Sequence, residues 1–332
     1  MERVLSHIKT IRKFSIGPSY KIVFEWEDIM SQSLNICFYP YTIWMNRLLK
    51  LLDILKLDTL FLTIIPRKRN ISLLFEMVAC GGIHCKFDKN TIPIIIDFWI
   101  EKDNLSKFYK FYKYAPLVLI TSKEVYDFLK ENKCPLNIEH WPLSIPDGLK
   151  IESEDKKYEF CFIGRKDPFF VDLLNRYANE NPDFEFVINN DDISNREYRT
   201  NKGNLVMKDT GRESYIKIIR QSKICTYTTP GFDKAKLQSN TYNQVTPRVL
   251  EMLAGGCYIL GHYPDNSETA FYNLKKVVPQ IHNYFEFKEY MDLYRKSPKR
   301  DIQECINYLK DHRTSSRIPI LKNILKKYDI RL

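Results

Sequence analysis

Residues 243–261 read Asn-Gln-Val-Thr-Pro-Arg-Val-Leu-Glu-Met-Leu-Ala-Gly-Gly-Cys-Tyr-Ile-Leu-Gly and predict a helix, a tight turn and a strand in immediate succession. Thr246 is a natural N-cap, and Pro247 suits the first helical position, where its missing N–H costs nothing. The glycine pair at 255 and 256 ends the helix, and Cys257 to Leu260 is an apolar run typical of a buried parallel strand. The stretch therefore predicts part of a parallel α/β sheet.

Arg248 and Glu251 stand three residues apart near the start of this helix, so they share one face. That end of a helix favours bound anions. A cation for phosphate and a carboxylate for hydroxyl groups would suit a nucleotide sugar. The alternative is an ordinary surface ion pair between the two side chains.

The length, composition and net charge of the chain are typical of a soluble globular protein with an anionic partner. A chain of 332 residues exceeds one ordinary core and predicts two domains. Apolar content of 44% with 28% charged residues is typical of globular chains. The net charge of +10 and the pI of 9.0 favour a nucleotide, a phospholipid surface or a nucleic acid as partner.

Cysteine usage and the apolar runs indicate a cytoplasmic protein. The eight cysteines are scattered with no C-x-x-C pair, which predicts reduced core thiols. Cys80, His84 and Cys85 lack a second ligand pair at zinc spacing, so no metal site is expected. Charged residues interrupt residues 1–20, so no signal peptide is expected there, and no apolar run approaches a membrane span of about 20 residues. We expect a cytoplasmic protein, with the inner face of the plasma membrane as a possible location.

The first half alternates between apolar runs and helical patterns, which predicts βαβ units. We expect strands at 20–26, 59–65 and 92–96 and helices at 43–57 and 73–78. The basic loop 66–69 would follow a strand, where open α/β sheets place ligand-binding loops, although a solvated charged turn is the more frequent explanation of such a loop.

Two further features of this half have more than one interpretation. Asp97 closes a buried strand, so it is a candidate base or simply a cap of the next turn. The stretch 101–114 interleaves lysines with aromatic residues. It fits single-stranded nucleic acid binding, a helix at a lipid surface, or a plain amphipathic helix covering the sheet.

The second half begins after a charged linker at 147–157, which sets predicted domains of 1–150 and 151–332, the latter with a helical tail. A strand at 158–163 runs into Gly164, Arg165 and Lys166 before a helix at 169–179. A glycine turn with two cations at a helix N-terminus predicts a diphosphate seat. The long loop 229–242 precedes the opening stretch, and loops of this length are usually functional.

With these motifs in place, the chain resembles glycosyltransferases of the GT-B architecture, most of all the bacterial group 1 and CgeB-like transferases. The resemblance rests on residues 162–165, Phe-Ile-Gly-Arg, and on residues 246–261. It covers 158 to about 295 well and the first half only in topology. It implies two doubly wound Rossmann-like domains facing across a cleft, the first for the acceptor and the second for the nucleotide-sugar donor.

The resemblance also implies residue roles. Glu251 would hold the ribose hydroxyls and Arg248 would reach the donor diphosphate. The resemblance assigns the phosphate-facing loop to Gly164, Arg165 and Lys166, and adds Asn243 and Thr246 to the donor site. Asn243 stands where many group 1 members carry a glutamate, and a neutral amide cannot supply the same charge.

The mechanism implied is transfer without a metal or cofactor, in which fixed cations and helix N-terminal amides stabilise the leaving diphosphate. Arg165 and Arg248 would act there. An inverting enzyme also needs a base in the first domain, with Asp97 as first candidate and His84 and Glu25 behind it.

Three functional classes follow. The first is a glycosyltransferase that moves a sugar to a glycan or lipid-linked acceptor in bacterial surface polysaccharide synthesis, with peripheral contact to an anionic membrane. The second is a nucleotide-sugar 2-epimerase of the same fold. The third is a non-catalytic protein that binds nucleic acid through 108–114; it ranks last because the basic residues do not form one recognisable module.

Overall fold

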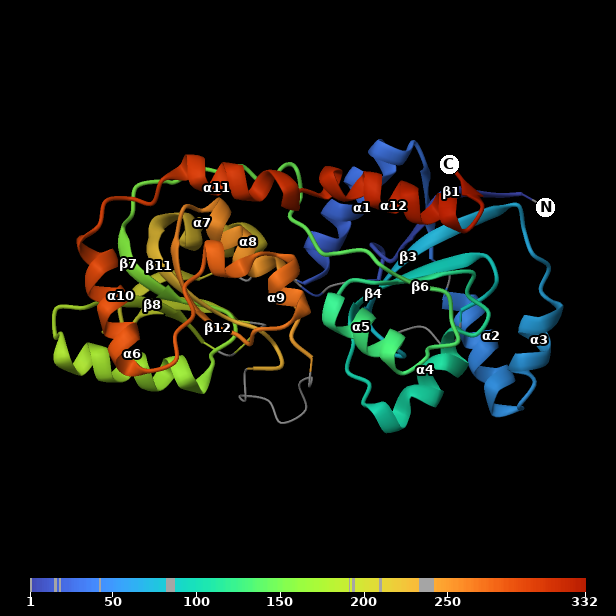
Figure 1. The fold of residues 1–332 in the computed structure, drawn as a ribbon, viewed down its shortest axis with the longest axis horizontal. Helices are drawn as coiled ribbons and strands as arrows, with labels where there is room; N and C mark the ends of the chain where they lie inside the picture. The colour runs from blue at the N-terminus through green and yellow to red at the C-terminus, as the bar shows by residue number, and fades with distance from the viewer. Residues whose placement is uncertain are drawn as a thin grey trace. The chain divides into compact units, whose positions relative to one another are not determined.

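The computed structural model describes residues 2–14, 17, 19–41, 43–81, 87–190, 192, 195–208, 211–232 and 242–332, and it divides into two compact units. Unit 1 comprises Met1–Pro146, Asn240–Tyr242 and Thr314–Leu332; unit 2 comprises Asp147–Ser239 and Asn243–Arg313. Each unit has a mainly parallel sheet with helices packed on it (Figure 1). The predicted fold class, two doubly wound α/β domains, is confirmed.

Unit 1 contains one parallel sheet, here called sheet A. Its elements in chain order are β1 (Arg3–Thr10), α1 (Tyr20–Leu34), β2 (Cys37–Pro40), α2 (Ile43–Ile54), α3 (Asp58–Ile64), β3 (Asn70–Val78), β4 (Thr91–Asp97), η1 (Lys102–Asn104), α4 (Leu105–Tyr112), β5 (Val118–Ile120), α5 (Lys123–Glu131), β6 (Ile138–His140), α12 (Thr314–Lys327) and β13 (Ile330–Arg331).

Every strand pair in sheet A is parallel. The order is β13-β1-β3-β4-β5-β6, and β2 also pairs with β1. β13 pairs with the first residues of β1 and β2 with its last, so both lie on one side of β1 while β3 lies on the other. The strand order therefore reverses at β1, and the carboxyl ends of β1 and β3 form a topological switch point, where α/β sheets bind ligands.

Helices bury both faces of sheet A. On one face, α1 and α12 lie side by side and pack Trp26 and Leu321 into the core (Figure 1). On the other face, α4 and α5 supply Phe108, Tyr112 and Leu129. The strands between them are accordingly almost continuous apolar runs, as expected for a sheet covered on both sides.

The C-terminal tail belongs to unit 1, whereas the sequence placed it in the second domain. α12 contributes Ile318, Leu321, Ile324 and Leu325 to the core beside α1, and β13 extends sheet A. The sequence pattern predicted that the tail is helical. The helix it packs against, α1, lies about 300 residues earlier in the chain, so no local pattern could indicate which unit the tail joins.

Unit 2 contains sheet C, whose strand order is β10-β9-β8-β7-β11-β12. Its elements are β7 (Tyr158–Phe162), α6 (Pro168–Glu180), β8 (Phe186–Asn189), β9 (Glu197–Thr200), β10 (Leu205–Lys208), α7 (Arg212–Gln221), β11 (Ser222–Thr228), α8 (Pro247–Ala254), β12 (Tyr258–His262), α9 (Ser267–Phe271), η2 (Leu274–Lys276), α10 (Tyr284–Lys296), α11 (Ile302–Leu309) and η3 (Lys310–His312).

The central strands of sheet C are parallel, and β9 and β10 are antiparallel at one edge. β7, the first strand, has β8 on one side and β11 on the other, so the order reverses here too. The apolar sides of α6 and α10 pack on this sheet through a core that includes Phe170, Tyr177 and Phe287. The carboxyl ends of β7 and β11 form the switch point of unit 2.

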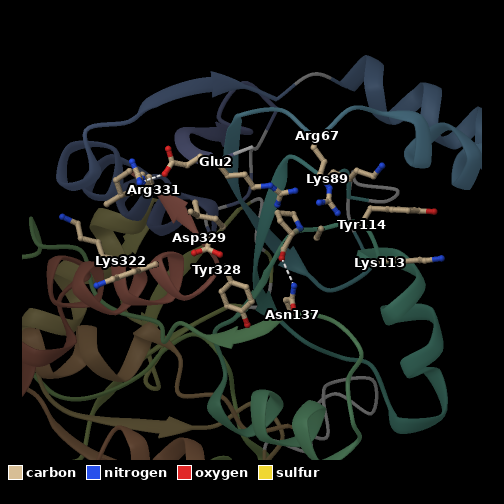
Figure 2. Close-up of a pocket in the computed structure, with 16 residues that line it drawn as sticks. Glu2, Arg67, Lys89, Lys113, Tyr114, Asn137, Lys322, Tyr328, Asp329 and Arg331 are labelled. Carbon is tan, nitrogen blue, oxygen red and sulfur yellow. Dashed lines mark hydrogen bonds and ion pairs between the residues drawn. The ribbon is translucent and has the colours of Figure 1, made fainter.

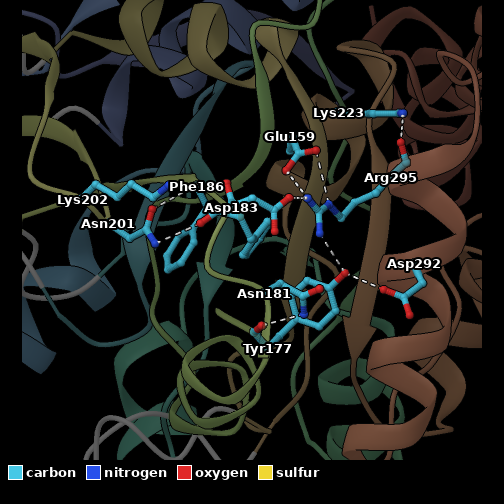
Figure 3. Close-up of polar contacts among 11 residues, drawn as sticks. Glu159, Tyr177, Asn181, Asp183, Phe186, Asn201, Lys202, Lys223, Asp292 and Arg295 are labelled. Atoms are coloured by element: carbon cyan, nitrogen blue, oxygen red, sulfur yellow. Dashed lines mark hydrogen bonds and ion pairs between the residues drawn. The ribbon is translucent and has the colours of Figure 1, made fainter. Parts of the chain in front are cut away.

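The amino-terminal edge of sheet C is closed by a network of paired charges (Figure 3). The Arg295 guanidinium at the end of α10 contacts Glu159 at 3.1 Å and Asp183 at 2.8 Å. It also donates to the Tyr177 hydroxyl, which donates to Asp292 at 2.6 Å. The carboxylates and the tyrosine raise the pKa of Arg295 above its ordinary value, against the effect of burial. The network ties α6 and α10 to the start of the sheet.

Three of the secondary-structure predictions in the first half are wrong. Residues 20–26, read as a strand, begin α1, whose buried residues recur at helical spacing as Val23, Trp26, Met30 and Leu34. Residues 59–65 fall in α3, and residues 73–78 fall in the central strand β3. Short apolar runs do not distinguish a buried strand from a buried helix, and the surrounding sheet decides.

The aromatic and lysine-rich stretch 101–114 covers the sheet, which is the plainest of its three interpretations. Phe108 and Tyr112 are fully buried, and Phe98 packs edge-on against Phe108. Side chains buried in the core are not available to stack on bases. None of the helices in the described part of the chain has the length and apolar composition needed to cross a bilayer.

We expect Leu321→Ala to destabilise unit 1 by about 2–5 kcal/mol, because it opens a cavity between α12 and α1. All four tryptophans (Trp26, Trp44, Trp99 and Trp141) lie in unit 1. Denaturant unfolding followed by tryptophan fluorescence therefore reports on unit 1. Leu293→Ala, at a half-exposed position of α10 in unit 2, is the control and should leave the transition unchanged. An unchanged transition for Leu321→Ala would contradict the assignment of the tail to unit 1.

Candidate functional site

The switch point of unit 2 brings Gly164 against Arg248. Gly164 follows β7 with a φ of +87°, a left-handed conformation that favours glycine. Its N–H donates to Asn189 Oδ1 at 2.7 Å, at the end of β8. A Cβ at Gly164 would lie 2.8 Å from Arg248 Cζ, so only glycine admits the guanidinium at this distance.

Arg248 is the second residue of α8, and its side chain is half-buried. Among the described residues, no hydrogen bond or ion pair engages its guanidinium. The alternative interpretation of the sequence, a surface ion pair with Glu251, is wrong, because Glu251 pairs with another arginine. A partly desolvated cation of this kind is suited to an anionic ligand.

The start of α8 follows the sequence prediction in position. Thr246 is the N-cap residue, Pro247 is the first helical residue, and Gly255 is the C-cap. The Thr246 side chain makes no capping hydrogen bond, whereas its amide donates to the Tyr227 hydroxyl at 3.0 Å. Because the side chain does not cap the helix, the first amides of α8 are not satisfied by it and add to the positive potential beside Arg248.

Glu251 lies one turn further along α8 and is 4% exposed. Its carboxylate forms an ion pair with Arg212, the first residue of α7. The Tyr215 hydroxyl, one turn further along α7, is buried and has no hydrogen-bond partner in the described part of the chain. Burial and then Glu251 raise the pKa of Tyr215, while Arg248 and Arg212 lower it. Arg212, Tyr215, Arg248 and Glu251 therefore form one polar cluster between α7 and α8.

A second polar group at this edge centres on the buried carboxylate of Asp167. Asp167 caps α6 by accepting from the Phe169 amide at 3.1 Å. It also accepts from Thr228 Oγ1 at 2.9 Å, at the end of β11, and contacts His262 Nδ1 at 2.6 Å, at the end of β12. One carboxylate thus joins the start of α6 to the carboxyl ends of β11 and β12.

The His262 ring is held by aromatic neighbours as well as by Asp167. It stacks on Phe169 with centroids 4.0 Å apart and meets the Phe232 ring edge-on at 4.5 Å. With Nδ1 directed at Asp167, Nε2 is the ring atom left for a ligand, and among the described residues no group bonds to it. The arrangement can hold or exchange a proton at one defined nitrogen.

The remaining predicted donor residues lie in the same unit. Asn243 is nearly buried, and its side-chain oxygen accepts from the Thr229 hydroxyl at 2.7 Å. Arg165 is exposed and Lys166 is half-buried in the turn between Gly164 and Asp167. The loop 229–242 lies mostly outside the described residues.

Asp97, the predicted base, belongs to unit 1 as the last residue of β4. The same edge of sheet A holds two buried carboxylates that the sequence did not single out. The Tyr112 hydroxyl donates to Glu76 Oε2 at 2.5 Å, and burial raises the pKa of Glu76 well above its ordinary value. Glu27 accepts from Thr10 Oγ1 at 2.7 Å at the end of β1.

Of the other two candidate bases, the structure describes Glu25 but not His84. Glu25 lies on α1, and its side chain is half-buried. His84 and Cys85 lie outside the described residues, so the prediction about them stays a prediction. Within the described residues, no three His, Cys, Asp or Glu side chains gather in a way that could hold a metal ion.

Comparisons with known proteins found similar solved structures but no similar sequence. No family model matches this sequence, and no curated protein matches it either. The crystal structure of TarM is similar with a TM-score of 0.49 and 11% identity, over 77% of this chain and 54% of that chain. The chain thus spans about half the length of TarM.

Sequence reasoning missed Asp167, Thr228 and His262, as well as Arg212 and Tyr215. A positional rule would have found the first three, since each stands at or just after the carboxyl end of a predicted parallel strand, where ligand-binding groups gather. Arg212 and Tyr215 carry no such signal, because only the packing of α7 on α8 brings them to Glu251.

We expect Gly164→Ala to weaken anion binding, because its Cβ displaces the Arg248 guanidinium. Gly203→Ala is a matched control, since Gly203 has a φ of +90° but a Cβ there would have no atom within 4 Å. Both variants should lose about 1–2 kcal/mol of stability from the left-handed backbone. Only Gly164→Ala should also lose affinity for inorganic pyrophosphate, measured by calorimetry. Equal affinities in the two variants would contradict the site.

We expect Glu27 to make unit 1 less stable as pH rises from its ordinary pKa of 4.5 to its folded pKa of about 7. Burial raises the pKa of Glu27 to about 7, above its ordinary value of 4.5, despite opposing hydrogen bonds from Thr10 and Arg12. A raised carboxyl pKa contributes stability that is present at low pH and lost as pH rises through the folded pKa. Between pH 5 and 8, wild type should lose about 2 kcal/mol relative to Glu27→Gln. Tryptophan fluorescence during unfolding measures this, and Glu131→Gln, an exposed site, should show no such difference.

Proposed function

We propose that the protein is a glycosyltransferase that uses a nucleotide-sugar donor, and that unit 2 binds the donor at its switch point. The observation that carries the proposal is the half-buried Arg248 guanidinium, which has no charged partner in the described part of the chain and lies against the left-handed Gly164. Nucleotides bind at such switch points in doubly wound folds, with phosphate at a glycine turn and a helix N-terminus. The finer grouping with CgeB-like transferases stays a prediction.

Arg248 and the first amides of α8 would receive the donor diphosphate. As the glycosidic bond breaks, negative charge grows on the leaving phosphate, and donors held in place beforehand stabilise it without reorganising. Arg165 and Lys166, in the turn beside Gly164, would add positive charge on the same side. These groups supply the stabilisation without a metal ion or a cofactor.

Glu251 would receive the ribose hydroxyls, as the resemblance implies. Its ion pair with Arg212 holds the carboxylate in place, and the buried Tyr215 hydroxyl beside it offers a further donor. Asn243 and Thr246 border the same helix end and would contact the nucleotide through neutral groups.

His262 would contact the donor through Nε2. Asp167 directs Nδ1, and Phe169 fixes the ring plane, so Nε2 has one orientation. A hydrogen bond from this nitrogen to a sugar or phosphate oxygen would position the donor. Asp167 would then act as a positioning residue.

The acceptor would bind to unit 1, with Asp97 as the proposed base. We propose a glycan or lipid-linked acceptor in bacterial surface polysaccharide synthesis, with the protein in the cytoplasm. The basic balance of the chain is consistent with a phosphate-bearing acceptor.

A panel of nucleoside diphosphates and nucleotide sugars tests the donor site by calorimetry. We expect one base to be preferred and Arg248→Ala to weaken that nucleotide by about 10- to 150-fold, the loss of a charge-assisted hydrogen bond. Arg248→Lys should recover part of the loss. Arg199→Ala, an exposed arginine of the same unit, is the control and should bind normally. Binding of no nucleotide, or equal binding by Arg248→Ala, would rule out the proposed site.

The 2-epimerase is the second candidate, because the pair of His262 and Asp167 places an acid–base group within the donor unit itself. An epimerase converts the nucleotide sugar without any acceptor. NMR of the donor alone with the enzyme separates the two: a new sugar epimer supports the epimerase, and an unchanged donor supports the transferase. Transfer that continues in the presence of a chelator would support metal independence.

A further inference from the structure

Unit 1 exposes a concentration of large apolar side chains on α2 and α3. The helices pack inward through Leu49 and Leu62, which are 4% and 0% exposed. Seven large apolar residues on the same segment remain exposed, by 46% to 78%: Trp44, Leu51, Ile54, Leu55, Leu57, Leu60 and Ile64. We call this the α2–α3 surface. Monomeric soluble proteins rarely expose apolar side chains in such density without a binding role.

Cations surround the α2–α3 surface. Arg47, Lys50 and Lys56 lie on α2 and the turn after it, and all are exposed. Arg67, Lys68 and Arg69 follow α3 directly, in the basic loop that the sequence singled out. An apolar helical surface with basic residues around it is the pattern of proteins that lie in the interface of an anionic bilayer.

A basic pocket adjoins the α2–α3 surface (Figure 2). It has a volume of about 1160 Å³, and its lining includes two acidic side chains and seven basic ones: Arg3, Arg67, Lys89, Lys113, Lys322, Lys326 and Arg331. Lys89 Nζ donates to the Thr63 carbonyl of α3 at 2.6 Å, and the Tyr114 hydroxyl lies 3.1 Å from Thr63 Oγ1. Two lining residues therefore contact α3, so the pocket and the surface are continuous.

The pocket lies at the amino-terminal edge of sheet A, opposite to the switch point. Because the strands are parallel, the residues that precede them gather at this edge: Arg67 before β3, Lys89 before β4 and Lys113 before β5. Burial and then the positive charge of Arg67 lower the pKa of Arg3.

At the corresponding amino-terminal edge of sheet C, unit 2 pairs its cation with carboxylates. There Arg295 pairs with Glu159 and Asp183 (Figure 3). In the basic pocket of unit 1, a single ion pair forms among the described lining residues, between Arg331 and Glu2. Lys113 follows α4 and Lys326 lies in the last turn of α12, where a cation interacts favourably with the helix dipole. The helix dipole does not account for Arg3, which lies on a strand, or for Arg67, which lies in a loop.

We propose that the α2–α3 surface docks unit 1 onto an anionic phospholipid bilayer. The apolar side chains enter the headgroup layer, and the cations of the adjoining pocket bind lipid phosphates. A second copy of the chain is a poorer partner, because a symmetric contact would bring the same cations together. The surface is separate from the donor site, so the proposal does not depend on the proposed activity.

Vesicle sedimentation tests the docking. Wild-type protein should bind vesicles of phosphatidylcholine with about 30% phosphatidylglycerol, remain unbound with phosphatidylcholine alone, and lose affinity as salt rises. Equal binding to both compositions, or binding to neither, would overturn the proposal.

Two variants address the two parts of the surface. Leu60→Ser with Ile64→Ser removes apolar contact, and Arg67→Ala with Lys113→Ala removes charge; each should weaken binding by about tenfold. The replaced side chains are exposed or line the open pocket, and circular dichroism should show unchanged folding. The controls are Phe285→Ser, which is 80% exposed in unit 2, and Lys21→Ala, exposed on α1; both should bind as wild type does. Equal loss in the controls would overturn the assignment to this surface.

Two further measurements exclude other occupants. Light scattering should show a monomer in the absence of lipid, and a dimer that dissociates in Leu60→Ser with Ile64→Ser would assign the surface to a second copy. Binding of inorganic pyrophosphate that depends on Arg67, without binding to anionic vesicles, would assign the pocket to a free phosphate ligand. Nucleoside diphosphate binding should be the same in the docking variants and in wild type, so failure of the donor site would be distinguishable.

Discussion

The close approach of the Arg248 guanidinium to Gly164 is the constraint on which the site of unit 2 depends. Gly164 adopts a left-handed φ, and a side chain there would occupy the place of the guanidinium. The parallel order of β7 and β11 brings the turn after β7 beside the segment that leads into α8. The glycine, the strand order and the position of Arg248 as the second residue of α8 are therefore parts of one arrangement.

The carboxylates at the same edge hold its other groups in place. Asp167 joins the start of α6 to the ends of β11 and β12 through three contacts. Glu251 joins α8 to α7 through Arg212. A buried carboxylate is stable only where donors or cations satisfy it, so each fixes the elements around it. Glu76 in unit 1 is less fully satisfied: its Oε2 accepts from the Tyr112 hydroxyl, and burial raises its pKa well above the ordinary value.

Parallel sheets have two chemically distinct edges, and the two units use them differently. Carboxyl ends of strands gather polar groups in both units. At the amino edge, unit 2 pairs Arg295 with carboxylates. In unit 1, most cations of the basic pocket form no ion pair with the described residues, and they lie beside an exposed apolar surface. Ion pairs neutralise the cation of unit 2 and tie neighbouring elements together. Cations without such partners, beside apolar side chains, can bind an anionic ligand. The contrast within one molecule indicates that the basic edge of unit 1 is not simply a consequence of the fold.

The second half was more predictable than the first, for a physical reason. Helix caps, proline at the first helical position and glycine turns are local signals, and residues 243–261 carry all three, so α8 and β12 follow from the sequence. Residues 20–26, 59–65 and 73–78 carry only short apolar runs, which suit either a helix or a strand until neighbouring strands pair with them.

The sequence by itself determined the α/β class, the existence of two doubly wound domains and the turn at Gly164, because these depend on local periodicity and backbone conformation. Only the tertiary structure decided that α12 and β13 complete unit 1, that Glu251 pairs with Arg212, and that Asp167 meets His262. Each of these joins residues distant in the chain, and contacts of that kind follow from strand order and packing, which no short stretch of sequence encodes.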